Sequence, residues 1–416
     1  MKVLVIGNGG REHAIAWKIA QSCLVEKVYC APGNGGTHVE NKCENIDLDK
    51  IDDLVKFAKD KDIDLTFVGP EAKLVEGISD VFKAEGLKIF GPSKKAAQLE
   101  GSKSFSKDFM KKYGIKTAAY EVFTEIEPAL KYVKTCPYPT VIKADGLAAG
   151  KGVVICQTVE EASNTLNEFM INDVFKGSGK KVVIEQFLDG VEASILSFTD
   201  GNTIIPFISS KDHKQIFDED KGPNTGGMGV IAPNPYCTAL VLEDFNENIL
   251  KPTLLGINSE EMDYVGVIFF GIMITKDGTY LLEYNVRMGD PETQAVLPLL
   301  KSDFTELVLA AIDKKLSSFN LEWEKGSSCC VVLASKGYPG SYETGKIIEI
   351  KPSKGKVFAA GAIYEDGHLK TSGGRVLSLV SIGSNLDEAI KNTYEDLISV
   401  NFEGAYCRKD IGKLYK

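Results

Sequence analysis

The stretch Lys2-Val3-Leu4-Val5-Ile6-Gly7-Asn8-Gly9-Gly10, at the start of the chain, decides the fold that we expect. Its mostly apolar residues 2–6 predict a buried strand, the glycines predict a turn, and the pattern over residues 11–22 predicts a helix. The same succession continues, with strands predicted at 25–30, 64–68 and 87–90 and helices at 51–61 and 71–85. This alternation predicts an N-terminal α/β domain with a doubly wound parallel sheet that is covered by helices.

Two loops of this predicted sheet, at residues 7–10 and 69–71, follow strands and are therefore expected to share one cleft at the carboxyl edge. The first loop is similar to a dinucleotide-binding turn, but Glu12 replaces the third glycine of the GxGxxG pattern. The second strand also ends without the acidic residue that holds the ribose of NAD. A smaller phosphate ligand at the helix N-terminus is therefore favoured over NAD, and a glycine turn without a ligand stays open.

Composition excludes several classes of partner. The chain has 48 Lys and Arg against 58 Asp and Glu, a net charge of -10, which disfavours nucleic acid and an anionic membrane surface. No apolar segment is long enough for a membrane span or a signal peptide, and the nine cysteines form no CxxC pair. We expect reduced thiols and a cytoplasmic location.

The length of 416 residues predicts several domains. We expect an N-terminal α/β domain over 1–101, a central domain over 102–320 and a small C-terminal mixed β domain over 328–416. A lysine-rich helix predicted over 102–113 marks the first boundary. Further elements are predicted as strands at 138–143, 181–186, 192–198, 264–275 and 280–285, a hairpin turn at Lys276-Asp277-Gly278, and a helix at 386–399.

The segment Lys143-Ala144-Asp145-Gly146-Leu147-Ala148-Ala149-Gly150-Lys151-Gly152 combines lysines and glycines after a strand. That composition suits a flexible loop that closes over phosphates. The segment is not a Walker A loop, because its glycine spacing is one residue short and Gly152 stands where Ser or Thr would bind magnesium. A solvated surface loop without a ligand remains an equal interpretation.

The segment Tyr280-Leu281-Leu282-Glu283-Tyr284-Asn285-Val286-Arg287 places three functional groups on alternate positions of a strand. Glu283, Asn285 and Arg287 would then face the same way. Carboxylate and amide oxygens suit magnesium, and a guanidinium can bind a small carboxylate with two parallel hydrogen bonds. The solvent face of an amphipathic strand is the alternative.

Two further segments have unusual composition. Residues 289–293 predict a helix start with Asp290 as cap and Pro291 as the first helical residue. The glycines of 222–229 indicate close approach of the backbone to another group, although a hinge without a ligand is also consistent. The sequence contains no GxSxG or HExxH pattern, and its four histidines lack metal-ligand spacing.

Eight segments, in order along the chain, resemble the glycinamide ribonucleotide synthetase family of ATP-grasp ligases. They are GNGGREHA at 7–14, APGN at 31–34, GPE at 69–71, KADGLAAGKG at 143–152, DHK at 212–214, GPNTGGMG at 222–229, EYNVRMGDPE at 283–292 and CRKDIG at 407–412. Met288 and Tyr284 are small departures from the family's usual residues. The resemblance spans essentially the whole chain.

The resemblance implies an ATP-grasp domain with a mobile lid at about 119–190, and an enzyme of de novo purine biosynthesis. Such an enzyme ligates glycine to 5-phosphoribosylamine and forms ADP and phosphate through glycyl phosphate. Magnesium is the implied cofactor, with manganese as an alternative, and the implied chain is a monomer or weak dimer.

The resemblance also implies a role for each site residue. ATP would be bound by Lys103, Lys143, Gly150, Lys151, Glu185, Leu188 and Glu192, metal by Glu283 and Asn285, glycine by Asp212 and Arg287, and phosphoribosylamine by Gly10, Arg11 and Glu71. Lys143, Asp212 and Arg287 would be the catalytic residues. A sister ATP-grasp ligase or carboxylase, a catalytically silent nucleotide-binding protein and an NAD dehydrogenase are the competing hypotheses.

Overall fold

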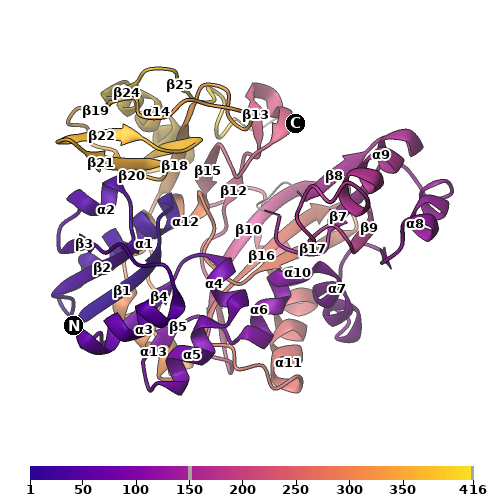
Figure 1. Ribbon diagram of the computed structural model, residues 1–416, viewed down its shortest axis with the longest axis horizontal. Coiled ribbons are helices and arrows are strands. Elements are labelled where there is room, and N and C mark those ends of the chain that lie inside the picture. The colour runs from indigo at the N-terminus through magenta and orange to yellow at the C-terminus, as the bar shows by residue number, and fades with distance from the viewer. Residues whose placement is uncertain (149–151, 414–416) are drawn as a thin grey trace.

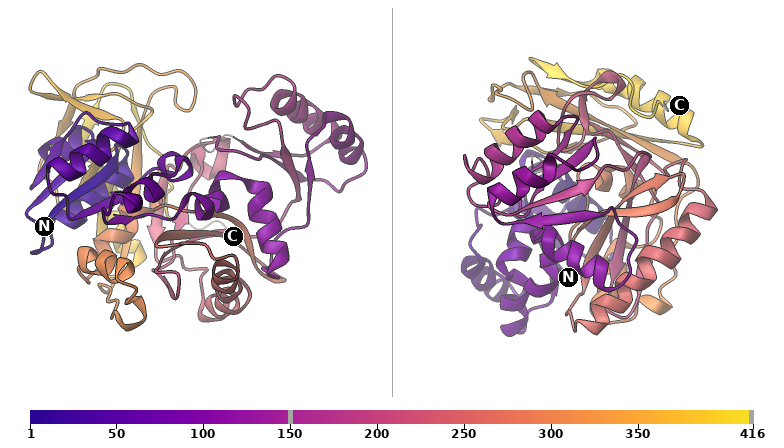
Figure 2. Two further views of the ribbon diagram at one scale, coloured as in Figure 1. Left: turned by 60° about the horizontal axis from the view of Figure 1, so that its bottom comes forward. Right: turned by 90° about the vertical axis from the view of Figure 1, so that its right-hand side faces the viewer.

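The computed structural model describes residues 1–148 and 152–413. Figure 1 shows three bodies: the N-terminal parallel sheet, the C-terminal β domain lying against it, and a central part that ends in a projecting lid. The left view of Figure 2 shows the lid, with α8 and α9, standing well away from the N-terminal domain.

The N-terminal domain is a parallel sheet with the strand order β3-β2-β1-β4-β5, as the sequence predicts. Its strands are β1 (Lys2–Gly7), β2 (Lys27–Pro32), β3 (Cys43–Asn45), β4 (Leu65–Val68) and β5 (Ile89–Phe90). Its helices are α1 (Gly10–Ala20), α2 (Gly35–Val39), α3 (Ile51–Asp60), α4 (Glu71–Glu76), α5 (Ile78–Ala84) and α6 (Lys94–Gly101).

Strand β1 shows why both faces of this sheet are covered. Val3 and Val5 join one hydrophobic cluster, whereas Leu4 and Ile6 join another. Because successive side chains of a strand point to opposite faces, each face of β1 needs its own apolar cover. The apolar run thus leads directly to a sheet between two layers of helices.

Several features of this domain differ from the prediction, among them α6, which was not predicted. The single helix expected over 71–85 is two helices, because Gly77 adopts φ +100° between α4 and α5. A left-handed residue interrupts the helical hydrogen bonds, and glycine adopts it without strain. The short β3 and α2 were not predicted, since three and five residues are too few for a periodic pattern.

The central part is built on an antiparallel sheet with the order β11-β10-β16-β17. Its strands are β10 (Val191–Thr199), β11 (Ile204–Pro206), β16 (Gly266–Thr275) and β17 (Gly278–Asn285), with α7 (Lys103–Lys112), α10 (Ala239–Phe245), α11 (Lys251–Ser259), α12 (Glu292–Val296) and α13 (Phe304–Ile312). The predicted hairpin turn is confirmed, since Thr275 pairs with Gly278.

The lid is a second antiparallel sheet with the order β6-β9-β7-β8. Its elements are β6 (Tyr120–Phe123), α8 (Ile126–Val133), β7 (Thr140–Ala144), β8 (Val153–Cys156), α9 (Val159–Met170) and β9 (Val182–Gln186). Leu166, Phe169 and Ile184 belong to a core separate from the other clusters. This unit can therefore keep its shape if it moves relative to the rest.

The C-terminal sheet has the order β12-β15-β18-β23-β20, and β25 also pairs with β18. The strands of this region are β12 (Lys211–Asp212), β13 (Gln215–Phe217), β14 (Lys221–Asn224), β15 (Gly229–Ala232), β18 (Ser327–Ser335), β19 (Ile348–Ile350), β20 (Lys356–Ala359), β21 (Ala362–Glu365), β22 (His368–Thr371), β23 (Arg375–Gly383), β24 (Val400–Phe402) and β25 (Ala405–Tyr406); α14 spans Leu386–Asp396. Strands β12 and β15 join this sheet from the middle of the chain. Asp212 is therefore carried on a strand of the C-terminal sheet.

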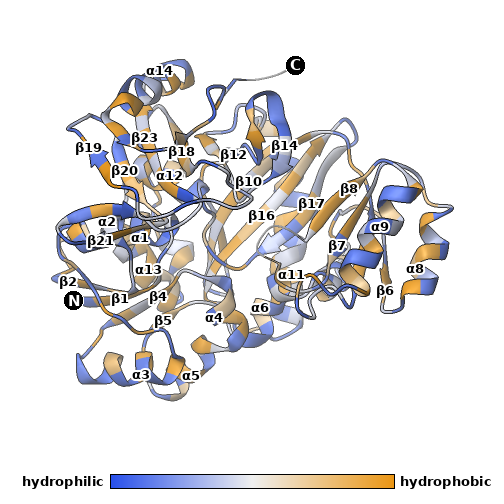
Figure 3. Ribbon diagram, turned by 45° about the horizontal axis from the view of Figure 1, so that its top comes forward, coloured by the Kyte–Doolittle hydropathy of each residue, from blue (hydrophilic) through white to orange (hydrophobic). Residues whose placement is uncertain are grey.

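One hydrophobic cluster contains Val3, Phe198, Phe304 and Phe358, and so links the N-terminal, central and C-terminal parts. Figure 3 shows hydrophobic residues along β10 and β16 and hydrophilic residues on much of the helical surface. In the part of the chain that the structure describes, no helix combines the length and apolar character needed to cross a membrane. The nine cysteines, which all lie in the described ranges, are free thiols.

Candidate active site

A β-bulge at Leu282 sets the direction of the side chains at the end of β17. Gly271 pairs with Glu283, but the next residue of β16, Ile272, pairs with Leu281. Leu281 and Tyr284 are both buried, although they are three residues apart. Without the extra residue, Glu283 would lie on the same face as Leu281 and enter the core. The bulge turns Glu283 and Asn285 away from the core.

Arg287, just after β17, lies among oxygen acceptors. Its Nη2 donates to Asn285 Oδ1 at 3.0 Å and lies 3.0 Å from Glu100 Oε1, and its Nε donates to Glu71 Oε2 at 3.2 Å. Nη1 donates to the carbonyl of Met288 at 3.2 Å. The predicted convergence of Asn285 and Arg287 is thus observed. Glu71 and Glu100, however, already pair with the Nε and Nη2 groups of the guanidinium.

Glu283 is a carboxylate surrounded by cations. Burial would raise its pKa, but Lys103, Lys143 and Lys214 lower the pKa to about 2. Lys103 Nζ lies 3.9 Å from Glu283 Oε2. The carboxylate is therefore ionised at neutral pH and can accept a divalent cation together with Asn285 Oδ1. No group of three or more His, Cys, Asp or Glu suited to a metal occurs among the described residues.

Lys143 and Lys107 share one buried carboxylate. Glu185 Oε2 lies 3.0 Å from Lys143 Nζ and 3.1 Å from Lys107 Nζ, and the side chains of Lys107 and Glu185 are each 2% exposed. Lys143 Nζ also donates to the carbonyl of Leu282 at 3.4 Å. Burial would raise the pKa of Glu185, but the two lysines lower it. The lid strands β7 and β9 are thereby connected to α7 and β17.

The loop after β7 contacts the start of α7. Asp145 Oδ1 accepts from the backbone N–H of Ser104 at 2.6 Å, so this carboxylate occupies the N-terminus of the helix. Leu188, just after β9, is half-buried. Gly150 and Lys151, which we expected to contact ATP, lie outside the described residues.

Asp212 and Glu292 are two carboxyl groups on the C-terminal side of the site, close enough for the charge of Glu292 to act on Asp212. Burial and the charge of Glu292 raise the pKa of Asp212 well above its usual value. Burial likewise raises the pKa of Glu292, whose Oε1 accepts from Ser194 Oγ at 3.2 Å. Two carboxylates that repel each other form a site where a cation is favoured. Nearby, Lys214 forms an ion pair with Glu192.

The loops after β1 and β4 lie against each other at the carboxyl edge of the sheet. Arg11 Nη1 lies 3.9 Å from Glu71 Oε2, and Arg11 Nε donates to Glu12 Oε1 at 2.5 Å. Glu12 Oε2 also accepts the N–H of Gly9 at 2.7 Å, so its carboxylate folds back over the start of α1. A Cβ on Gly69 would lie 2.2 Å from Glu12 Oε1, which explains glycine at this position.

A cavity of about 320 Å³ lies beside this loop. Its lining comes from the N-terminal domain, the segment after β17 and the C-terminal domain: Asn8, Gly9, Gly33, Asn34, Asp290, Tyr338, Ala360, Gly361, Ala362, Ile363, Ser372 and Arg375. Backbone amides, Asn34 and Arg375 give it a polar wall. The cavity could hold a small polar ligand next to Gly10.

Arg375, at the start of β23, connects the C-terminal domain to the glycine-rich loop. Its Nη1 donates to the carbonyls of Gly226 at 2.6 Å and Asp290 at 2.8 Å. A Cβ on Gly227 would lie 2.4 Å from Pro291 Cδ and 2.8 Å from Asp212 Oδ1. The close approach that the glycines predict is therefore to other parts of the protein.

The predicted cap of α12 is wrong. The helix begins at Glu292, Pro291 occupies the cap position, and no side chain caps it. The carboxylate of Asp290 instead accepts from Gln294 Nε2 at 2.8 Å and lies 3.4 Å from Arg375 Nη2. Tertiary contacts, which a local pattern does not contain, determine the direction of Asp290.

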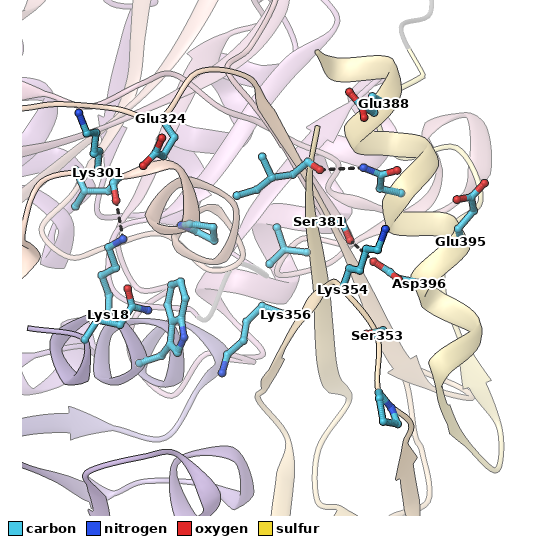
Figure 4. Close-up of a pocket in the computed structure, with 18 residues that line it drawn as sticks. Lys18, Lys301, Glu324, Ser353, Lys354, Lys356, Ser381, Glu388, Glu395 and Asp396 are labelled. Atoms are coloured by element: carbon cyan, nitrogen blue, oxygen red, sulfur yellow. Dashed lines mark hydrogen bonds between the residues drawn. The ribbon is translucent and has the colours of Figure 1, made fainter. Parts of the chain in front are cut away.

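A larger cavity, of about 1070 Å³, lies between α1 and α14 (Figure 4). Several of its polar and charged groups already have partners within the protein. Lys18 Nζ donates to the carbonyl of Leu300 at 2.6 Å, Lys356 Nζ lies 2.7 Å from Glu40 Oε2, and Ser381 Oγ donates to Asp396 Oδ2 at 2.9 Å. A large volume by itself does not identify a functional site, and the charged cluster around Glu283 is the better candidate.

Sequence reasoning missed Lys107, Lys214, Glu100, Glu292 and Arg375. Lys107 follows Lys103 by four residues on a predicted helix, and that spacing places both lysines on the same helical face. Glu292 and Lys214 stand within two of the segments already singled out. No local signal connects Glu100 or Arg375 with the site, because each reaches it through tertiary contacts.

Comparison with known proteins identifies the family. Models of the phosphoribosylglycinamide synthetase N domain, ATP-grasp (A) domain and C domain match residues 1–100, 101–293 and 328–414. Phosphoribosylamine–glycine ligase of Clostridium acetobutylicum is 66% identical over 99% of this chain and 100% of its own length. The Escherichia coli K12 enzyme is 49% identical over 99% of this chain and 98% of its own.

Solved structures agree with this result. Crystalline phosphoribosylamine–glycine ligase from Thermotoga maritima is 37% identical and superposes with a TM-score of 0.88, covering 99% of this chain and 100% of that one. The biotin carboxylase domain of Hydrogenobacter thermophilus 2-oxoglutarate carboxylase, solved with MgADP and bicarbonate, is 17% identical with a TM-score of 0.75, covering 97% and 91%. The latter similarity concerns the fold. The chain belongs to the phosphoribosylglycinamide synthetase family of ATP-grasp enzymes.

Proposed function

We propose that this chain ligates glycine to 5-phosphoribosylamine and cleaves ATP to ADP and phosphate, as a step of purine biosynthesis. The observation that best supports the proposal is the cluster at the end of β17. There an ionised Glu283 and the amide oxygen of Asn285 lie among Lys103, Lys143 and Arg287. Such a cleft can bind a triphosphate with its metal ion and a small carboxylate side by side.

ATP would lie between the lid and the central sheet. Lys103 and Lys143, with Gly150 and Lys151 of the loop after β7, would contact its phosphates. Glu185 and Leu188, at the end of β9, would contact adenine, and Glu192 the ribose. Glu185 Oε1 is buried and lacks a hydrogen-bond partner among the described residues, so it could accept from the adenine amino group.

Glycine would lie between Arg287 and Asp212. The positive charge of Arg287 would attract its carboxylate, and one N–H of Nη1 has no acceptor among the described residues. Asp212, with Glu292 beside it, would receive its ammonium. Charge alone would thus orient the amino acid, with its carboxylate towards the triphosphate.

Phosphoribosylamine would enter from the N-terminal side. Gly10, Arg11 and Glu71 are assigned to it, and the cavity of about 320 Å³ beside Gly9 offers room. Glu71 lies between Arg11 and Arg287, and although burial would raise its pKa, these two arginines lower it. An ionised Glu71 could accept hydrogen bonds from the sugar hydroxyls or the amine.

The reaction needs two displacements, because a carboxylate does not react with an amine at neutral pH. A glycine carboxylate oxygen attacks the γ-phosphorus, the bond to the bridging oxygen breaks, and ADP leaves. The amine then attacks the glycyl carbonyl carbon, phosphate leaves and a proton is released. When bound to Glu283 and Asn285, magnesium or manganese would offset the negative charge of the triphosphate. Closure of the lid at about 119–190 would exclude water from glycyl phosphate.

Oxygen-18 transfer tests this proposal. With glycine labelled in both carboxylate oxygens, we expect one labelled oxygen in the phosphate released, and ADP release that requires glycine and the amine. Unlabelled phosphate would exclude activation of glycine by phosphoryl transfer. Replacing glycine with other amino acids or bicarbonate would distinguish a sister ligase or carboxylase.

A further inference from the structure

Lys107 is a buried ammonium that the proposed function leaves without a role. It lies one turn after Lys103 on α7, is 2% exposed, and its Nζ donates to Thr117 Oγ1 at 2.7 Å. Its charged partner is Glu185, the carboxylate that also binds Lys143. A lysine is rarely buried so completely unless its charge is balanced nearby.

The charges of this cluster do not balance, even when Glu283 and its neighbour Lys103 are included, because three lysines then face two carboxylates. Among the described residues in direct contact, Lys107 and Lys143 share Glu185, so two ammonium groups face one carboxylate. Lys143 with Glu185 would already be a neutral pair. The extra buried cation costs stability in the free protein, and a bound anion would offset that cost.

The two carboxylate oxygens of Glu185 have different surroundings. Both lysines bind Oε2, at 3.0 and 3.1 Å. Oε1 is buried without a partner among the described residues. If Lys107 were absent, Lys143 could form an undivided ion pair with Glu185, and its ammonium would be less available to other anions.

We propose that Lys107 is a positioning residue for nucleotide binding: by sharing Glu185 Oε2 it keeps the Lys143 ammonium available for the ATP phosphates and supplies the cleft with one further positive charge. This inference rests on the proposed function, in which Lys143 contacts those phosphates. Lys107 itself need not touch the nucleotide.

The test is calorimetric binding of MgATP to the full chain, followed by ligase kinetics. Lys107→Met replaces the ammonium with an unbranched apolar side chain, and Lys107→Arg keeps the charge. Lys111→Met is the matched control, because Lys111 lies one turn further along α7 and is exposed.

We expect Lys107→Met to raise the Kd for MgATP by about tenfold or more, since one buried charge is lost next to the phosphate site. Lys107→Arg should restore binding to within about threefold, and Lys111→Met should bind as the wild type does. The KM for glycine should change little in all three. Equal MgATP affinity in Lys107→Met and the wild type would overturn the proposal. A parallel loss of ATP and glycine affinity would also overturn it, because that result indicates a general structural defect.

A pH titration decides the matter if Lys107→Met does not fold. Burial lowers the pKa of Lys107 to about 8. The charged and titratable groups facing it are Glu185, Lys143, Glu283 and Tyr120. Because the protonated form favours ATP, affinity in the wild type should fall above pH 8, by up to about tenfold per pH unit. Lys107→Arg should lack this fall, and identical profiles would overturn the proposal.

These results separate the two proposals. If the wild type binds MgATP but does not ligate glycine, the proposed function fails, and the effect of Lys107 on binding still decides the inference. If the wild type does not bind MgATP, both fail. If the wild type ligates glycine and Lys107→Met binds MgATP normally, the inference alone fails.

Discussion

Arg287 Nη2 donates to Asn285 Oδ1 at 3.0 Å, so a guanidinium fixes the direction of the neighbouring amide. The amide oxygen then points to the side of the strand where Glu283 lies among lysines. Oδ1 has a second lone pair, so it can accept from Arg287 and still ligate a cation. Arg287 thereby has two effects: it supplies charge and it orients a metal ligand.

Arg287→Lys should raise the KM for glycine and lower kcat/KM by about hundredfold, because an ammonium cannot bind Glu71, Glu100 and Asn285 together. The substitution should also cost about 2 kcal/mol in the free energy of unfolding, since buried Glu100 loses its partner at 3.0 Å. Steady-state kinetics and urea unfolding measure the two effects.

Arg408→Lys is the control for stability. Arg408 is fully buried and pairs with Asp410 at 2.8 Å, outside the proposed glycine site. Arg408→Lys should lose about as much stability as Arg287→Lys, with a much smaller change in the KM for glycine. Equal changes of KM in the two variants would contradict a specific role for Arg287.

Glu283→Ala should lower kcat by about hundredfold or more while the chain stays folded, because it removes a proposed metal ligand without opening a core cavity. The side chain is 38% exposed in the cleft, so its loss leaves no buried void. Glu349→Ala, on the exposed face of β19, is the control and should keep wild-type activity. Near-normal turnover of Glu283→Ala at saturating magnesium would exclude the metal role.

The sequence predicts the N-terminal sheet because each of its longer strands is an apolar run flanked by turn residues. It also places Glu283, Asn285 and Arg287 on one side of a strand. It does not contain the bulge at Leu282, which corrects the alternation so that both Leu281 and Tyr284 enter the core. A bulge depends on pairing with another strand and therefore leaves no local pattern.

Long-range contacts explain the rest of what was missed. Strand β12 has only two residues, Lys211–Asp212, and exists because β15 pairs with it. The cap predicted at Asp290 fails because Gln294 and Arg375 hold its carboxylate. Such contacts join residues far apart in sequence, which periodicity and capping preferences cannot relate. The domain bounds and the roles of individual site residues remain predictions.

Gly227→Ala should raise the KM for glycine and cost about 3 kcal/mol, because its Cβ would lie 2.8 Å from Asp212 Oδ1 and 2.4 Å from Pro291 Cδ. Gly86→Ala is the matched control: Gly86 also has a positive φ, +72°, but nothing lies within 4 Å of the added Cβ. Gly86→Ala should lose about 1 kcal/mol of stability through backbone strain, with normal kinetics. Similar kinetics for the two variants would show that Gly227 does not position Asp212.

Glu40→Gln should weaken the contact between the N-terminal and C-terminal domains in a pH-dependent way. Burial would raise the pKa of Glu40, but His13 and Lys356, which lies 2.7 Å away, lower it to about 2. A carboxyl with a lowered folded pKa contributes stability above the unfolded pKa of about 4.5 and loses it as pH falls towards 2. Chemical unfolding at neutral pH should therefore show a loss of about 2 to 3 kcal/mol in Glu40→Gln, which shrinks to less than about half by pH 3.

The exposed pair of Glu44 and Lys27, at 2.8 Å, is the control, and Glu44→Gln should lose under about 1 kcal/mol. A difference between wild type and Glu40→Gln that is constant from pH 7 to 3 would mean that Glu40 acts by packing and not by charge.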